Sequence, residues 1–447
     1  MNGKVILNGI VSLAVRRFAG PFWLRRRQLA RTQWLDGPSL EALQLSLLRR
    51  LIGHCYATVP FYRQLMQDRG LTPDAIGSLS DIQKMPVITK QDVLQAGDAI
   101  ISTKFPRWRR RRTSTSGTTG APMPIYRNLF SIGDEHAFVR RQWDWAGVGL
   151  FDKCAYLKGR VFTEIGRQTD RLHMYDPVMR ELHLSTYHLS PEIVPTYVKI
   201  LEQHGVKTLI GYPSSIYPVA KTCLDRKIPL KLDAVLLTSE TLIQPYRNAI
   251  SEAFGCKVFD FYGGAERVCY IFTCEHGRYH VQPEYGLTEL IPVDSEEEGC
   301  SRIVATGFWN MAMPFVRYDT GDLVIRSRDG CPCGRAFPVV DRIIGRQGDV
   351  IVTPSGRQLG ASIVTHLVYV ICGADHFLES QVIQDATDHI TIEYVPGQQC
   401  TPEHLAGFEQ RLQKYLPQDL RCALREVDAV SRTKAGKIRP IVSRIKP

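Results

Sequence analysis

The sequence predicts an α/β protein with a large amino-terminal domain, built from parallel-sheet αβ subdomains plus a distorted β-barrel, and a small α+β carboxyl-terminal domain. A chain of 447 residues is too long for one ordinary core, so two or more domains are expected. Between Gly205 and Glu266, short apolar runs separated by helix-length polar stretches are typical of βαβ units that feed a parallel sheet. In residues 286–340, apolar and polar residues alternate as they do in antiparallel strands of a barrel-like sheet. We therefore place the amino-terminal domain at residues 1–345 and the carboxyl-terminal domain at residues 349–447, within the usual size range of a domain.

Residues 1–70 are predicted to form a helical cap. Leucines recur at helical spacing from Leu40 to about Leu65, and Pro60 marks a break in the helix. The apolar run at residues 5–15 is too short for a membrane span and is followed by no clear small-residue cleavage pattern, so a cytoplasmic location is expected.

The basic amino terminus has two interpretations. Arg25, Arg26 and Arg27 stand near Trp23, and a basic, amphipathic helix of this kind can lie at the inner face of an anionic membrane. The alternative, which we favour, is a helix packed on the main body of the protein.

A second basic run, Arg107 and Arg109 to Arg112, contributes to the formal net charge of +11. The run contains only Trp108 as an aromatic residue, and no nucleic-acid motif accompanies it, so no nucleic-acid partner is expected. A solvated face or a basic entrance for phosphorylated ligands is the better interpretation.

The stretch Thr113 to Gly120 follows directly and offers a hydroxyl or a glycine at every position. Hydroxyls and backbone N–H groups can surround an oxyanion, and glycines permit the backbone conformations that turn successive N–H groups toward one point. The stretch is not a Walker A motif, because Gly120 is followed by Ala121 and Pro122. It predicts a phosphate-binding loop, with a plain flexible connector as the alternative.

Three strands of the parallel sheet stand out, at Thr208–Gly211, Ala234–Thr238 and Val258–Tyr262. Each runs into a loop of small or polar groups, namely Tyr212 to Ser215, Ser239 to Thr241 and Gly263 to Glu266. Ligands of open α/β sheets bind at the carboxyl ends of strands, so these loops predict one shared site.

The order of the motifs resembles that of the adenylate-forming enzymes, which include the acyl-CoA synthetases, and is most similar to their phenylacetate-CoA ligase branch with its CapK-type capsular polysaccharide proteins. The motifs are the hydroxyl loop, Tyr262–Gly263–Gly264–Ala265–Glu266, Arg317–Tyr318–Asp319–Thr320–Gly321–Asp322, Gly345–Arg346 and Ala435–Gly436–Lys437. Residues 59–63 and 84–90 resemble the amino-terminal region of that branch, so the similarity covers nearly the whole chain.

The resemblance implies a two-step reaction and a mobile carboxyl-terminal domain. A carboxylic acid attacks the α-phosphate of ATP to give an acyl-AMP and pyrophosphate, with Mg²⁺ as cofactor. A thiol, of CoA as co-substrate or of a carrier-protein pantetheine, then takes the acyl group; an amine on a sugar or other acceptor is the alternative. Such a chain acts on a small-molecule acid, and its CapK-type relatives suggest a place in polysaccharide biosynthesis.

The resemblance also implies the residues that bind the nucleotide. The β- and γ-phosphates would be held by Thr115, Ser116, Gly117, Thr118, Thr119 and Gly120, with Thr118 among the catalytic residues. Tyr262 would lie on the adenine, in a nucleotide site that includes Ser239, Glu240, Gly263 and Gly264.

The remaining roles concern charged groups and the acid pocket. Glu266 would coordinate Mg²⁺ because that hard cation prefers carboxylate oxygen, and Asp322 would accept from both ribose hydroxyls. Arg346 would reach the ribose or a phosphate, and Lys437 would support attack on the α-phosphate. The acid pocket would be lined by Tyr212, Pro213, Ser239 and Gly264.

Two departures from the family pattern keep a second class of function open. Ala265 stands where the family usually has Thr or Ser, and Gly348 replaces the first residue of the usual Asp-Asp hinge pair. A non-catalytic nucleotide-binding scaffold is therefore the alternative to an AMP-forming acid–thiol ligase. A basic zinc protein that binds nucleic acid ranks last.

Two clusters of soft ligands predict a metal site. The chain has twelve cysteines and no secretory signal, which favours reduced thiols over a disulfide framework. Cys274, His280, Cys331 and Cys333 could supply the four tetrahedral ligands of a structural Zn²⁺, with His276 as a substitute for His280. The alternative is a set of reduced, partly buried cysteines beside a surface histidine.

Overall fold

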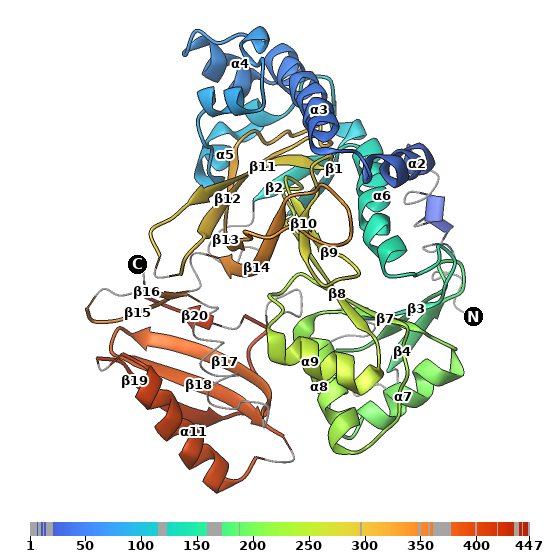
Figure 1. Cartoon of the computed structure of the whole chain (residues 1–447), viewed down its shortest axis with the longest axis vertical. Coiled ribbons are helices and arrows are strands. Elements are labelled where there is room, and N and C mark those ends of the chain that lie inside the picture. The colour runs from blue at the N-terminus through green and yellow to red at the C-terminus, as the bar shows by residue number, and fades with distance from the viewer. Residues whose placement is uncertain are drawn as a thin grey trace. The chain divides into compact units, whose positions relative to one another are not determined.

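A computed structural model of the chain (Figure 1) describes residues 7, 10–11, 13–14, 21–114, 123–158, 172–186, 188–295, 297–346, 350–355, 358–360, 377–397, 400–417, 419–432, 438–439 and 441–445. The chain divides into two compact units. The first comprises residues 1–150, 177–179 and 261–343, and the second residues 151–176, 180–260 and 344–447. The boundaries expected at residues 345 and 349 stay a prediction.

The first unit consists of a helical cap and an antiparallel sheet. Its helices are α2 (Phe22–Thr32), α3 (Gly37–Thr58), α4 (Pro60–Gln67), α5 (Lys90–Ala96) and α6 (Leu129–Trp145). Its strands are β1 (Arg111–Ser114), β2 (Pro124–Arg127), β9 (Tyr270–Thr273), β10 (Tyr279–Val281), β11 (Gly286–Pro292), β12 (Cys300–Gly307), β13 (Tyr318–Arg326) and β14 (Val339–Arg346).

Helices α2, α3 and α4 lie in the region where a helical cap is expected, and the extent of that cap, residues 1–70, stays a prediction. In α3, the carboxylate of Asp36 accepts the N–H of Ser39 at 2.9 Å, which satisfies one of the unpaired donors at the helix start. The apolar face of α3 buries Leu48 and Leu51 completely, and the helix ends at Thr58, before the break expected at Pro60.

Helix α2 packs on α6 (Figure 1), as expected for the favoured interpretation of the basic amino terminus. Arg25 pairs with Asp134 at 2.8 Å and Arg26 with Asp144 at 3.0 Å, both on α6. Trp23 and Leu24 of α2 remain exposed.

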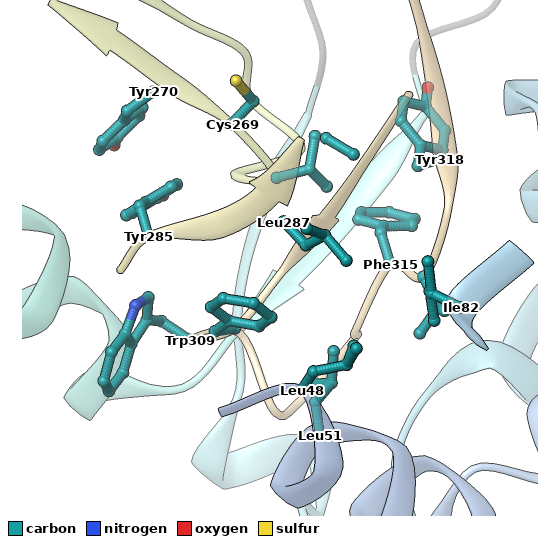
Figure 2. Close-up of a cluster of buried hydrophobic side chains, with 14 of the residues drawn as sticks. Leu48, Leu51, Ile82, Cys269, Tyr270, Tyr285, Leu287, Trp309, Phe315 and Tyr318 are labelled. Carbon is teal, nitrogen blue, oxygen red and sulfur yellow. The ribbon is translucent and has the colours of Figure 1, made fainter. Parts of the chain in front are cut away.

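The antiparallel alternation expected for residues 286–340 is confirmed. Strands β11, β12 and β13 pair in antiparallel order, and the sheet continues from β13 through β14, β10 and β9 to the end of β8. The core beneath this sheet is rich in aromatic residues. Figure 2 shows Tyr270 and Tyr285, whose rings stack at 3.7 Å, together with Trp309, Phe315 and the α3 leucines.

The second unit contains the parallel sheet. Its strands are β3 (Cys154–Leu157), β4 (His173–Asp176), β5 (Glu181–Leu184), β6 (Thr208–Gly211), β7 (Ala234–Thr238) and β8 (Lys257–Gly263), of which residues 261–263 belong to the first unit. Its helices include α7 (Val194–Gln203), α8 (Pro213–Asp225) and α9 (Gln244–Phe254). Strands β5, β3, β6 and β7 run parallel, and α8 and α9 pack side by side (Figure 1). The three strands expected here are all confirmed.

The carboxyl-terminal residues of this unit form an α+β structure with its own core, as expected. They contain β15 (Val350–Val352), β16 (Gln358–Gly360), β17 (Phe377–Ala386), β18 (His389–Pro396), α11 (Pro402–Tyr415), β19 (Arg421–Glu426) and β20 (Ile441–Ser443). The sheet has the order β19-β18-β17-β20. Ile243 and Tyr246 of the α9 region pack against this core.

Within the part of the chain that the structure describes, no helix combines the length and apolar character that a membrane span requires.

We expect Tyr62→Phe to destabilise the first unit. The buried Tyr62 Oη donates to the carbonyl of Pro314 at 3.1 Å and accepts the N–H of Val316 at 3.0 Å. Its removal leaves two buried backbone groups without a partner, which costs about 1–3 kcal/mol. The urea concentration at half-unfolding should fall, whereas Tyr56→Phe, at a partly buried position, should leave it nearly unchanged. Equal midpoints for Tyr62→Phe and the parent protein would contradict this account.

Candidate active site

Several residues expected at the active site lie outside the described residues. They are Thr115, Ser116, Gly117, Thr118, Thr119, Gly120 and Lys437, as well as Gly348 of the expected hinge. The backbone of Arg346 ends strand β14, and its side chain is not among those described. The remaining expected residues fall in the two units and are considered unit by unit.

In the first unit, the structure brings Tyr262 and Asp322 together. Tyr262 Oη donates a hydrogen bond of 2.7 Å to Asp322 Oδ2, which joins the end of β8 to β13. Burial and the neighbouring Asp322 carboxylate hold the pKa of Tyr262 well above its usual value, so the phenol stays protonated and remains a donor. The N–H of Asp322 in turn donates to Thr320 Oγ1 at 3.1 Å, which fixes the backbone on the other side.

Glu266 lies in the loop that follows, close to the same strand. Tyr318 Oη, on β13, donates to Glu266 Oε1 at 3.4 Å. Glu266 Oε2 lies so close to Gly264 that a Cβ at that position would come within 2.6 Å of it. Gly264 therefore makes room for the carboxylate, and an alanine there would displace Glu266.

The loop after β8 crosses β11 and β12 at two glycines. Gly286 and Gly307 face each other across these strands. A Cβ at Gly286 would lie 2.2 Å from the carbonyl oxygen of Val268, and a Cβ at Gly307 would lie 2.5 Å from that of Arg267. Backbone cannot yield as a flexible side chain can, so this crossing requires glycine at both positions.

A buried ion network holds the same loop. Arg267, which has a positive φ of 61°, pairs with Glu135 of α6 at 2.9 Å and donates to Tyr270 Oη at 3.0 Å. Glu135 also pairs with Arg127. Burial alone would raise the pKa of Glu135, but the two arginines outweigh burial and lower it, so the carboxylate stays charged.

Two further residues that hold this region together, Glu135 and Arg317, were assigned no role from the sequence. Arg317 has an Nη2–Oε1 distance of 2.8 Å to Glu289, and its Nη1 donates to the carbonyl of Met85 at 2.6 Å. Arg317 is the first residue of the motif Arg317–Asp322, and its place in that motif could have indicated a structural role. Glu135 carried no recognised signal, because Arg267 stands far from it in the sequence, and no pattern marks its pairing with Arg127, eight positions before it.

Three of the four expected acid-pocket residues, Tyr212, Pro213 and Ser239, stand in the second unit at the start of α8 and the end of β7, whereas Gly264 belongs to the first unit. Tyr212 is almost fully buried, and Pro213 occupies the first turn of α8, where its missing N–H costs nothing. Ser239 adopts a positive φ of 72°, which is rare for a residue with a side chain.

Glu240, an expected nucleotide contact, already accepts three hydrogen bonds. Its Oε2 accepts the N–H of Ser214 at 3.0 Å, and its Oε1 accepts Ser214 Oγ and the N–H of Ile438, both at 3.0 Å. Its carboxylate thus joins the start of α8 to the carboxyl-terminal residues of the same unit.

The four expected metal ligands come together in the first unit. One ligand atom from each of Cys274, His280, Cys331 and Cys333 lies within 4.8 Å of the others. The two Sγ atoms of Cys274 and Cys331 are 3.6 Å apart, and Cys333 Sγ is 3.4 Å from His280 Nε2. His276 contributes only its backbone N–H, which donates to Cys274 Sγ at 3.4 Å.

The surroundings of this cluster suit a metal ion. His280 is fully buried, and burial together with the nearby Arg335 lowers its pKa to about 4, so its imidazole is neutral at pH 7, as a ligand must be. Arg335 is held by Glu275 at 2.9 Å and lies 4.1 Å from the ring centroid of Trp145. Three thiols and one imidazole make four donors, which is the number and kind of ligands in a tetrahedral structural zinc site.

Comparison with solved structures defines the class of fold. The crystal structure of a 2-hydroxyisobutyryl-CoA ligase in the postadenylation state, in complex with R3-HIB-AMP, is similar to this chain with a TM-score of 0.70. The two are 19% identical, and the alignment covers 93% of this chain and 91% of that one. The fold is that of the adenylate-forming ligases.

Comparisons of sequence point to one branch of that class. The chain is 26% identical over 346 residues to protein CapK of Staphylococcus aureus, covering 75% of this chain and 74% of the relative. It is 27% identical over 335 residues to phenylacetate-coenzyme A ligase of Thermus thermophilus, covering 71% and 73%. A family model described as the CapK C-terminal domain matches residues 351–444. The resemblance to the phenylacetate-CoA ligase and CapK branch is thus confirmed.

We propose that the cysteine–histidine cluster holds a structural zinc ion, and we expect the purified protein to contain about one zinc per chain. Cys333→Ser should lose the metal and lower the thermal midpoint, because zinc binding contributes to folding free energy. Cys400→Ser is the matched control, since Cys400 is also partly buried and lies outside the cluster. Metal analysis and calorimetry measure both effects. A purified protein that contains no zinc, and whose thermal midpoint is the same in Cys333→Ser, would contradict this proposal.

Proposed function

We propose that the chain is an AMP-forming acid–thiol ligase, which activates a carboxylic acid with ATP and passes the acyl group to CoA. The observation that carries the proposal is the close array of Tyr262 at the end of β8, Glu266 in the loop that follows, and Asp322 on β13. All three belong to the family's nucleotide motifs, and the hydrogen bonds from Tyr262 to Asp322 and from Tyr318 to Glu266 join the first two to β13.

The proposed reaction has two steps. In the first, a carboxylate oxygen of the acid attacks the α-phosphorus of ATP, the bond to the bridging oxygen breaks, and pyrophosphate leaves. In the second, the thiol sulfur attacks the acyl carbon, AMP leaves with the bonding electron pair, and the thiol proton is released. The product is a thioester.

The described residues would position the nucleotide in this reaction. Tyr262 would support the adenine face. Asp322 accepts from Tyr262 at one oxygen, and a carboxylate has further lone pairs for the ribose hydroxyls. Glu266 would hold Mg²⁺, which neutralises the triphosphate, and Tyr318 orients that carboxylate.

The roles of the remaining residues stay proposals carried by the resemblance. Residues 115–120 would surround the β- and γ-phosphates, Arg346 would reach the ribose or a phosphate, and Lys437 would support attack on the α-phosphate. Tyr212, Pro213, Ser239 and Gly264 would line the acid pocket.

Finer assignments belong to the same proposal. An aryl acid, as in the phenylacetate-CoA ligases, and a place in polysaccharide biosynthesis, as the CapK relatives suggest, are the first candidates. Carrier-protein pantetheine and a sugar amine are the alternative acceptors. Trp23 and Leu24, exposed on α2, are the residues through which the amino terminus would meet a membrane.

Exchange of labelled pyrophosphate into ATP, with Mg²⁺ and a panel of aryl, aliphatic, hydroxy and amino acids, tests the first step. We expect exchange that requires one class of acid and falls by about 100-fold or more in Lys437→Ala, because a cation at the developing charge contributes several kcal/mol. Lys434→Ala, a lysine of the same segment, is the matched control. ATP binding without exchange on any acid would favour the non-catalytic scaffold.

Asp322→Asn should weaken ATP binding. An amide offers one oxygen acceptor where the carboxylate offers two, and the loss of a hydrogen bond to a charged group raises the dissociation constant by about tenfold or more. Titration calorimetry with a non-hydrolysable ATP analogue measures this constant. Asp341→Asn, which changes a carboxylate that pairs with Arg278 at the surface, should leave the constant unchanged. Equal affinity in both variants would rule out the ribose role.

A further inference from the structure

Tyr270 contacts the loop that carries Glu266 at both of its ends. A Cβ at Gly263, where the loop begins, would lie 2.6 Å from ring carbons of Tyr270, so the ring fills the space next to that glycine. At the other end, Tyr270 Oη accepts a hydrogen bond of 3.0 Å from Arg267. The ring of Tyr270 is fully buried and stacks on Tyr285, as Figure 2 shows. The tyrosine therefore gives the loop a fixed support.

Arg267 directly follows Glu266 in the sequence, and the backbone turns at this residue. Its positive φ of 61° is rare for a residue with a side chain. Such a conformation persists where surrounding contacts enforce it. Here Nη1 of Arg267 pairs with Oε1 of Glu135, on α6, at 2.9 Å. The ion pair therefore restrains the backbone directly next to Glu266.

The carboxylate of Glu135 is itself held in place on α6. Its second oxygen, Oε2, pairs with Arg127 at the end of β2, so each oxygen serves one arginine. Helix α6 begins one residue after Asn128, whose buried side chain accepts the N–H of Ser131 at 2.7 Å. This cap satisfies one of the free donors at the helix start and fixes the turn that precedes Glu135.

The side chain of Glu266 has weaker support than its backbone. Among the described residues, Tyr318 supplies the hydrogen bond to this carboxylate, and its length of 3.4 Å makes it a weak one. Glu266 is also partly exposed, so packing alone does not fix it. The position of the carboxylate consequently depends on where the backbone of residues 266 and 267 is held.

We propose that Glu135 is a positioning residue for Glu266 and acts through Arg267. This inference rests on the proposed function, in which Glu266 holds Mg²⁺. Groups behind a metal ligand determine its orientation, and their loss weakens the metal site. Glu135 holds the side chain of Arg267, and the peptide bond carries that restraint to Glu266. Glu135 would itself touch neither the metal ion nor the nucleotide.

A buried ion pair can also serve stability alone, and a matched variant separates the two roles. Asp134 precedes Glu135 on the same helix and is also buried, but it pairs with Arg25 of α2 at 2.8 Å. Asp134→Asn and Glu135→Gln thus each remove one charge from an ion pair of α6. The pair of Asp134 holds the helical cap, whereas that of Glu135 holds the loop of Glu266.

The first measurement is the effect of Mg²⁺ on nucleotide binding. Titration calorimetry of the full chain with a non-hydrolysable ATP analogue gives the dissociation constant without and with Mg²⁺, and their ratio reports the contact of the protein with the metal. Glu135→Gln should lower this ratio by about tenfold, as loss of a partner behind a metal ligand does. The constant without Mg²⁺ should change little. Glu266→Gln should lower the ratio as well, and Asp134→Asn should leave it at the parental value.

Two further measurements complete the test. Glu135→Asp, whose shorter side chain keeps the charge, should give an intermediate ratio, and it replaces Glu135→Gln if that variant does not fold. In hydrogen–deuterium exchange, peptides that contain residues 263–268 should exchange faster in Glu135→Gln than in the parent, and at the parental rate in Asp134→Asn.

Three results would overturn the inference. A parental ratio in Glu135→Gln, with a lowered ratio in Glu266→Gln, would show that Glu135 does not place the metal ligand. Equal losses in Glu135→Gln and Asp134→Asn would mean that both charges merely stabilise the fold. If Mg²⁺ does not affect ATP binding by the parent protein, the proposed role of Glu266 fails and the inference fails with it. That last case is recognised because Glu266→Gln would then also change nothing.

Discussion

The passage of residues 263–268 across Gly286 and Gly307 is the constraint on which the described part of the proposed nucleotide site depends. No side chain fits at either glycine, because backbone oxygens of Arg267 and Val268 occupy the space. This close crossing limits where the loop can lie above β11 and β12; Tyr262, just before the loop, and Glu266, within it, both contact residues of β13. The hydrogen bonds from Tyr262 to Asp322 and from Tyr318 to Glu266 follow from that placement.

Buried charge gives the same loop its rigidity. Arg267 and Arg127 both pair with Glu135, and the carboxylate stays charged although it is buried. Removing one partner of such a pair leaves an uncompensated buried charge, which is far more costly than the pair itself is stabilising. The network therefore resists local opening next to Glu266, and a rigid loop spares the ligand the entropy of ordering it.

The sequence was sufficient for elements with strong local patterns and insufficient for long-range partners. The strands at 208–211 and 234–238 were predicted to the residue, because an apolar run bounded by turn residues is a local signal. The cysteines and the histidine expected at a metal site come together in the structure, because closely spaced cysteine and histidine residues are a local signal in the sequence. Glu240 and Ile438 are 198 positions apart in the sequence, and no local sequence pattern near either residue indicates their hydrogen bond. Glu135 was missed because its partner Arg267 also stands far from it in the sequence.

Backbone strain is relevant to whether this chain catalyses a reaction, although Ala265 stands where the family usually has Thr or Ser. Five non-glycine residues with positive φ occur among the described residues, and three of them, Ser239, Arg267 and Arg317, stand within or directly beside the loops and motifs of the expected site. Such conformations cost about 1–3 kcal/mol each and persist where the surrounding structure enforces them, most often at functional sites. A scaffold that had lost its reaction would gain stability by relaxing them. The ion pairs of Arg267 and Arg317 hold two of these residues in place, which favours a site still kept in working geometry. Ala265 itself packs against the apolar core of the first unit, so the residue that departs from the family pattern contributes apolar contacts at this position.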